Sequence, residues 1–178
     1  MTYLFLAPGF EEIEALATVD ILRRADISVT TVSILDTPVV PGAHNVPVTA
    51  DAVIGNVDLT NAEMLILPGG MPGATNLAAT KRLTDALLTA KCRIAAICAS
   101  PAVVLAPLGI LNGKEAICYP GFESKLTGSR ISDNVVVTDG NVTTAAGPGF
   151  TMEFALELVR LLRSDDKADE VASGLLLL

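Results

Sequence analysis

Runs rich in β-branched and aliphatic residues alternate with segments of helical periodicity, and this alternation limits the fold more than any other feature of the chain. Short, nearly continuous apolar runs are typical of strands covered on both faces. Segment 11–25 begins with acidic residues and ends with Arg23-Arg24, as a helix dipole favours. Strands that alternate with helices predict an α/β sandwich with a mostly parallel sheet and right-handed crossovers. The strands are expected at 3–7, 28–34, 64–67 and 93–97, and the helices at 11–25 (with Ile13, Leu16, Ala17 and Ile21 at helical spacing) and around 81–90.

The rest of the chain completes a single domain over residues 1–178. Val135–Val137 and Val142–Thr144 flank Asp139-Gly140-Asn141, which is a strong hairpin signal. Segment 38–58 indicates a small hairpin or an excursion at the sheet edge, and a last helix is expected at about 151–162. The tail over 164–178 is charged and then rich in leucine. A chain of 178 residues is long enough to bury one core, and it shows no linker or internal repeat.

Composition excludes several classes of partner. The formal net charge of −8 argues against a nucleic-acid backbone and against anionic lipid. No apolar run approaches the roughly 20 residues that a membrane span needs, so no membrane partner is expected. The 3 cysteines form no CxxC or zinc-type pattern, which predicts neither a disulfide framework nor a metal site, and no cofactor motif is present. The acidic start has no secretory pattern, and we expect a cytoplasmic protein.

Three loops are expected at the carboxyl edge of the sheet, where open α/β sheets bind ligands. These loops are 8–14, 68–73 and 98–100. Topology should therefore bring Cys98, the Gly69-Gly70 backbone and one or more of the glutamates in 11–14 into one neighbourhood. The glycine-rich loop lacks the Lys-Ser/Thr of a phosphate-binding P-loop, so its glycines are read as tight turns.

Cys98 stands where a strand turns into a helix, and two interpretations remain open from the residues alone. As a nucleophile on a sharp turn, it would receive helix N–H groups that lower a thiol pKa from about 8.5 to roughly 3.5–7.5. The small neighbours Ala96, Ala99 and Ser100 fit such a turn. As a core residue, it would be a small buried hydrophobe, which is what most free cysteines are. Cys92 and Cys118 are interpreted as structural.

The sequence resembles the DJ-1/ThiJ/PfpI superfamily and is closest to its DJ-1/ThiJ branch. The stretches that carry the resemblance are APGFEEIEA, LILPGGMPGATNL, RIAAICASPAVVLAPLGILNGKEA and AAGPGFTMEFALELV, which together cover residues 2 to about 163. The resemblance implies a flavodoxin-like three-layer sandwich, a homodimer, and a reactive Cys98 on a nucleophile elbow. It also implies that Glu14 is a protonated acid paired with the thiolate, and that the N–H groups of Gly70 and Ala99 form an oxyanion pocket.

The sequence departs from the family pattern at several positions. Ala99 stands where many protease-like relatives have a histidine after the cysteine, and Tyr119 stands where DJ-1-like relatives often have one. The usual Ala-Gly-Pro after the cysteine is Ala99-Ser100-Pro101. His44, the only histidine, falls where DJ-1-like members often have an arginine near the dimer face. Tyr119 and His44 are therefore candidate substrate-site residues, with a surface histidine as the simpler interpretation of His44.

The function that the resemblance favours is turnover of small 2-oxoaldehydes such as methylglyoxal without glutathione. Cys98 would form a hemithioacetal and Glu14 would shuttle a proton. Deglycation of early sugar-type adducts uses the same first step. An oxidative-stress sensor or chaperone, which uses oxidation of Cys98, is the alternative. A PfpI-type peptidase or amidase ranks last, because no histidine beside Cys98 can protonate a leaving amine. The partner would be a small aldehyde or an oxidant.

Overall fold

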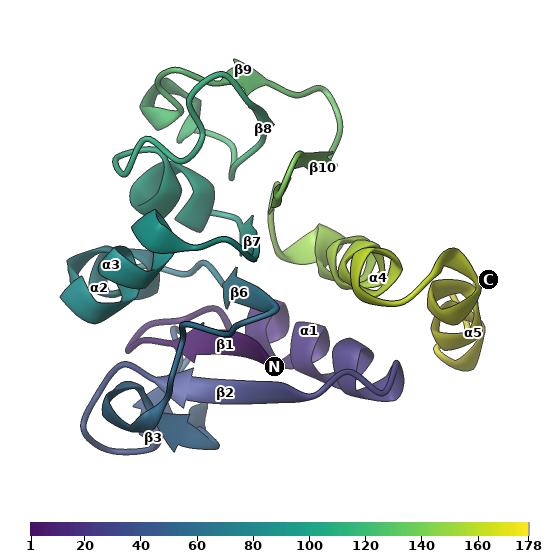
Figure 1. Cartoon of the computed structure of the whole chain (residues 1–178), viewed down its shortest axis with the longest axis horizontal. Coiled ribbons are helices and arrows are strands. Elements are labelled where there is room, and N and C mark those ends of the chain that lie inside the picture. Colours follow the sequence, from purple (N-terminus) through teal and green to yellow (C-terminus); the bar gives the residue numbers. More distant parts are fainter. Residues whose placement is uncertain (178) are drawn as a thin grey trace.

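The computed structural model describes residues 1–177 and has a seven-stranded central sheet with the strand order β10-β11-β7-β6-β1-β2-β5 (Figure 1). Neighbouring strands are parallel except at the edge pair β10 and β11. Helices flank this mostly parallel sheet, which confirms the predicted α/β class. The strands of this sheet are β1 (Thr2–Leu6), β2 (Val29–Ser33), β5 (Ala52–Val53), β6 (Met64–Leu67), β7 (Arg93–Ile97), β10 (Val136–Asp139) and β11 (Val142–Ala145).

Two helical layers cover the sheet, so both faces of its strands are buried. In β1, Leu4 and Leu6 belong to the core cluster beside α1, α4 and α5, whereas Phe5 belongs to the cluster beside α2 and α3. Figure 1 shows α1 next to α4, and α2 next to α3. Within residues 1–177, no helix is long and apolar enough to cross a membrane. The helices are α1 (Glu12–Arg24), α2 (Gly73–Ala79), α3 (Lys81–Thr89), α4 (Thr151–Leu162) and α5 (Asp165–Gly174), with a π-helical turn at Pro101–Leu105.

The strand order places three loops at one point of the sheet edge. From β1 the chain passes to β2 on one side, and then returns to β6 on the other side of β1. This reversal is the topological switch point of a flavodoxin-like sheet, outside which ligands bind. The loops that follow β1, β6 and β7 are therefore neighbours, as the sequence predicted.

The smaller predicted strands are also present, with some differences in pairing. Segment 38–58 contains the hairpin of β3 (Val39–Pro41) and β4 (Pro47–Thr49), which forms its own two-stranded sheet. The same segment ends in β5, which pairs with β2 at the edge of the main sheet. The turn between β10 and β11 contains Gly140 at φ 64°, as the Asp-Gly-Asn signal predicted. A further parallel pair joins β8 (Glu115–Ala116) to β9 (Arg130–Ile131).

Helix α1 forms where expected but buries only part of the face that its apolar spacing indicated, since Ile21 is 1% exposed. Ile13 and Leu16 are exposed, at 55% and 40%. The buried face instead carries Glu14 and Thr18, which are both fully inaccessible. A fully buried carboxyl is costly unless it is neutral or well bonded, so its placement points to a purpose other than packing.

The charged tail contains a helix, α5, that the sequence analysis did not predict. Ser164 caps α5 by accepting a hydrogen bond from the Lys167 N–H, and α5 packs against α4. Ala168, Val171 and Ala172 are the buried residues of α5. Charged residues dominate the segment and obscure this short apolar face. The leucine-rich end of the tail extends to residue 178, which lies outside the described residues.

We predict that Val171→Ala destabilises the protein by about 2 kcal/mol, because it removes two buried methyl groups and leaves a small cavity. Ser173→Ala, on the exposed side of the same helix, is the matched control and should change stability little. Urea denaturation of both variants measures the difference. Equal stabilities would mean that α5 contributes nothing to the core.

Candidate active site

Cys98 lies at the end of β7 in a backbone conformation that non-glycine residues rarely adopt. Its φ is 64°, and a strained residue of this kind costs about 1–3 kcal/mol. Backbone hydrogen bonds hold it on both sides: its N–H donates to Ala145 O at 2.9 Å, and its carbonyl accepts from the Tyr119 N–H at 2.8 Å. The chain then enters the π-helical turn at Pro101–Leu105. This sharp turn from strand into helical turn is the nucleophile elbow that the sequence predicted.

The loop after β6 packs directly against the elbow. A Cβ on Gly69 would lie 2.6 Å from Cys98 Cβ and 2.9 Å from Cys98 Sγ, so only glycine fits there. Ser100 Oγ donates a 2.6 Å hydrogen bond to Pro68 O and ties the two loops together. Gly70 has φ 86°, and a Cβ there would run into the backbone of Gly9 and Glu11. These glycines serve close approach of backbone rather than phosphate binding.

Glu14 projects from the first turn of α1 into the same place. Its side chain is fully buried, and its Oε2 accepts a 2.7 Å hydrogen bond from the Gly69 N–H. Its Oε1 has no hydrogen-bond partner among the described residues 1–177. The sequence placed the Gly69-Gly70 backbone near Cys98 but did not indicate that the Gly69 N–H bonds the Glu14 carboxyl and holds it beside the sulfur. The signal was present in the Gly-Gly pair after β6.

Burial shifts both acidic groups of the pair upward. Burial raises the pKa of Glu14 from 4.5 to about 7, although the hydrogen bond from Gly69 opposes the shift. Burial and the negative charge of Glu14 raise the pKa of Cys98 from 9.0 to about 12. The backbone N–H groups of Gly70 and Ala99 act in the opposite direction and lower the pKa of the thiol. Burial therefore outweighs the effect of these donors on the thiol pKa, and the sequence shows the donors but not the depth of burial.

The pair consequently holds a single proton over a wide pH range. Two acids in contact lose their protons in separate steps, and here the steps fall near pH 7 and near pH 12. Between them, one negative charge is shared by a carboxyl and a thiol. For Cys98 to be a thiolate in this pH range, the one proton must lie on Glu14. The N–H groups of Gly70 and Ala99 favour this arrangement, because they stabilise negative charge on the sulfur.

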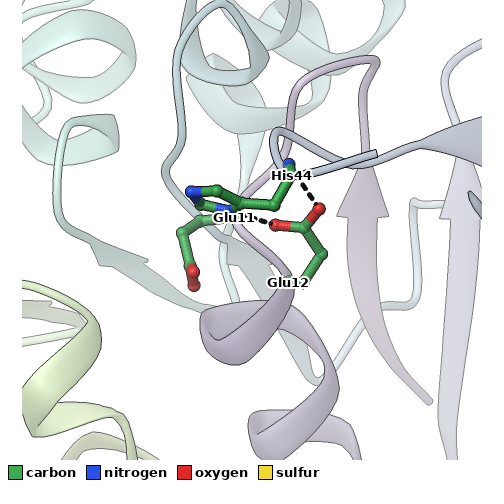
Figure 2. A group of neighbouring side chains, drawn as sticks. All are labelled: Glu11, Glu12 and His44. Atoms are coloured by element: carbon green, nitrogen blue, oxygen red, sulfur yellow. Dashed lines mark hydrogen bonds and ion pairs between the residues drawn. The ribbon is translucent and has the colours of Figure 1, made fainter. Parts of the chain in front are cut away.

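His44 lies on the surface near the start of α1, where it binds Glu12 (Figure 2). Glu12 Oε1 accepts the His44 backbone N–H at 2.6 Å, and Oε2 pairs with His44 Nδ1 at 2.8 Å. A Cβ on Gly42 would clash with Glu12, so the hairpin of β3 and β4 is fitted closely onto this carboxylate. The hydrogen bond to Glu12 raises the pKa of His44. His44 thus fastens the hairpin to α1 within this chain.

Among the described residues, Glu11, Glu12 and His44 form a group that could be considered for a metal ion, because their potential metal-ligand atoms all lie within 4.8 Å of one another (Figure 2). Carboxylate and imidazole atoms suit zinc and related ions. However, both Glu12 oxygens already bind His44, and one oxygen of Glu11 caps α1 by accepting the Glu14 N–H. The positive end of the helix dipole at this point further disfavours a cation. The cluster therefore serves to hold the helix start and the hairpin.

Two cavities lie at opposite edges of the sheet. A cavity of about 280 Å³ lies at the carboxyl edge, beside the elbow, and is lined by Tyr119, Pro120 and residues 146–150. A larger cavity of about 620 Å³ is lined by residues 59–62 and by the segment from Ala86 to Cys92. Cys92 directly precedes β7, so the larger cavity lies at the amino edge, away from Cys98. The sequence pointed to Tyr119 but not to the loop 146–150.

We predict that Glu14 makes the protein less stable as the pH rises from 4.5 through 7. The folded protein holds a proton that the unfolded chain releases near pH 4.5, so its stabilising effect is complete below pH 4.5 and is lost as the pH passes 7. At about 1.4 kcal/mol per pKa unit, the loss is about 3 kcal/mol. Denaturation of the wild type and Glu14→Gln at several pH values should show the variant gaining relative stability by this amount. A constant difference between the two proteins from pH 4 to 8 would contradict the buried-acid argument.

Comparison with known proteins identifies the family. The model of the DJ-1/PfpI family matches residues 2–161. Protein dj-1beta of Drosophila melanogaster is 36% identical over 178 residues, covering 97% of this chain and 95% of its own. The glutathione-independent glyoxalase DJR-1.2 of Caenorhabditis elegans is 34% identical over 175 residues, covering 94% of this chain and 90% of its own.

Solved structures agree with the sequence matches. Oxidized DJ-1 of Toxoplasma gondii superposes with a TM-score of 0.94 at 36% identity, covering 98% of this chain and 97% of that one. Some relatives are much longer than this chain, which spans only 40% of the length of protein DJ-1 homolog B of Arabidopsis thaliana. The family match extends over most of the chain, and the fold, the elbow and the relatives agree with it. The chain belongs to the DJ-1/PfpI family.

Proposed function

We propose that this protein is a cysteine-dependent enzyme that converts small 2-oxoaldehydes into 2-hydroxy acids without glutathione. The observation that carries the proposal is the placement of the buried Glu14 carboxyl and the Cys98 sulfur together against the Gly69 backbone. A family relative is named as a glutathione-independent glyoxalase, which supports the same chemistry.

The first step is addition of the thiol to the aldehyde. The Cys98 thiolate attacks the aldehyde carbon, a sulfur–carbon bond forms, and the carbonyl π electrons move to oxygen. The Gly70 and Ala99 N–H groups stabilise the developing oxyanion. Glu14 gives its proton to that oxygen, which completes the hemithioacetal and leaves a carboxylate.

The second step moves a proton between neighbouring carbons. The Glu14 carboxylate removes the proton from the former aldehyde carbon, and the electrons pass to the neighbouring carbonyl oxygen to give an enediolate. Glu14 then returns the proton to the adjacent carbon, while the hydroxyl proton of the first carbon passes to the oxygen of the second. The first carbon is thereby oxidised to a thioester and the second is reduced to an alcohol, so the electrons balance within the substrate. Water then cleaves the thioester, which releases the hydroxy acid and restores the thiol. Aldehyde adducts of amines and thiols enter by the same first addition, so deglycation is an extension of this proposal.

A redox-sensing role is the second candidate, and a specific comparison favours it. The DJ-1 structure from Toxoplasma gondii is that of an oxidized protein. The Glu14 Oε1, without a partner among the described residues, would donate a hydrogen bond to an oxidised sulfur if it carried the proton. A peptidase role has less support, because the only histidine binds Glu12 on the surface. The expected homodimer and cytoplasmic location remain predictions, and the exposed Ile13 and Leu16 of α1 offer an apolar face for a second copy.

Cys98→Ser should reduce methylglyoxal consumption to the buffer rate, because the oxygen nucleophile lacks the thiolate character that the reaction requires. Cys92→Ser, which changes a half-buried cysteine at the other edge of the sheet, is the control and should retain activity. Glu14→Gln should lower kcat by about 10²–10⁴-fold, since it removes the acid and base of both steps. Full turnover by Cys98→Ser would overturn the proposed function.

The rate of Cys98 alkylation should show an inflection near pH 7, where the shared pair loses its first proton. Glu14→Gln leaves a single titrating thiol, so this inflection should vanish. Iodoacetamide labelling followed by mass spectrometry measures the rate at Cys98 separately from the other cysteines. The shared-proton argument fails if the inflection persists unchanged in Glu14→Gln. If the alkylation rate shows the inflection near pH 7 but the protein turns over no aldehyde, the redox-sensor role is favoured.

A further inference from the structure

The apolar cavity beside the elbow gives the proposed enzyme a substrate preference. We propose that Tyr119, Pro120 and the loop 146–150 bind the substituent of a 2-oxoaldehyde held on Cys98, so that aryl and branched-alkyl 2-oxoaldehydes are better substrates than methylglyoxal. This inference rests on the proposed function and adds the class of substituent.

The cavity is continuous with the reactive residue through the sheet register. Ile97 of β7 pairs with Ala145 of β11, so the next residues, Cys98 and Ala146, leave the sheet side by side. Ala146 lines the cavity. The opposite wall is attached to the same residue, because the Tyr119 N–H donates to the Cys98 carbonyl at 2.8 Å. A substituent that extends from Cys98 toward β11 would therefore meet both Ala146 and Tyr119.

The lining selects apolar groups. It consists of proline, alanine and glycine residues and the rings of Tyr119 and Phe150, and the Tyr119 hydroxyl is its one polar side-chain group. A carboxylate or ammonium substituent would lose hydration there without gaining an ionic partner. The volume of about 280 Å³ is ample, since an apolar cavity of about 150 Å³ already accepts benzene.

Two features of the walls fit an aromatic or branched guest. Tyr119 and Phe150 are 44% and 40% exposed, so their rings retain surface that a substituent can cover. Gly147 keeps the Tyr119 ring close to the loop, because a Cβ at that position would lie 3.0 Å from Tyr119 Cδ2. The ring of Tyr119 thus forms a wall at the position where relatives of the DJ-1 branch often have a histidine.

The test compares kcat/KM for phenylglyoxal and methylglyoxal in the wild type and in Tyr119→Ala. The wild type should favour phenylglyoxal by about tenfold or more, which is typical of discrimination by a hydrophobic pocket. Tyr119→Ala should lose most of this ratio, and Tyr119→Phe should keep it because the ring remains. Met152→Ala is the control, since Met152 is an exposed apolar residue that does not line the cavity. Comparing ratios between variants cancels the different intrinsic reactivities of the two aldehydes.

A second readout does not depend on turnover. The relative rates of Cys98 alkylation by N-phenyliodoacetamide and iodoacetamide should favour the aryl reagent in the wild type and fall in Tyr119→Ala. Ala146→Val, which narrows the cavity from the sheet edge, should lower the same ratio without removing a wall. Ratios that are equal in the wild type and in both variants would overturn the inference.

The two readouts separate the possible failures. Absence of turnover with either aldehyde would overturn the proposed function, and the alkylation ratios would then decide the cavity by themselves. Methylglyoxal turnover with unchanged ratios in all variants would leave the proposed function standing and would overturn the substituent preference.

Discussion

The active site depends on one unfavourable burial: the carboxyl of Glu14 lies inside the protein against a sulfur atom. Burial disfavours its charged form, and among residues 1–177 only one of its oxygens has a hydrogen-bond partner, the Gly69 N–H. The surrounding structure is built to tolerate this arrangement. Gly69 has no side chain where Cys98 approaches, and Cys98 adopts a strained backbone conformation to meet the carboxyl. Such strain persists only when neighbouring contacts over-determine it, and here the backbone hydrogen bonds that Cys98 donates to Ala145 of β11 and accepts from Tyr119 do so.

The sequence was sufficient for the architecture because the strands are covered on both faces. Their continuous apolar character distinguishes them from the amphipathic helices, and parallel order then follows from the alternation. The same reasoning located Cys98, Gly70 and Glu14 at one edge, since the carboxyl ends of parallel strands meet there. The family resemblance selected Glu14 among three glutamates, which residue patterns alone did not.

The features that sequence reasoning missed depend on depth and on packing between distant segments. Apolar spacing in α1 suggested that Ile13 and Leu16 face the core, yet the helix turns Glu14 and Thr18 inward. The burial of the thiol was also missed, because N–H donors are visible in a sequence and desolvation is not. Helix α5 was missed because its buried residues are few and small among many charges. The cavity wall at 146–150 forms only when β11 lies beside β7, and no local pattern encodes that pairing.

The three glutamates at the start of α1 perform different tasks within a single helical turn. Glu11 caps the helix, Glu12 holds the hairpin through His44, and Glu14 faces Cys98. Each residue advances the helix by about 100°, so one inserted residue in the loop before Glu11 would shift every side chain to a neighbouring direction. Surface loops usually accept insertions, because nothing depends on their length. The loop between β1 and α1 should instead tolerate changes in length as poorly as a core position tolerates substitution, since its length sets which side chain points at the sulfur.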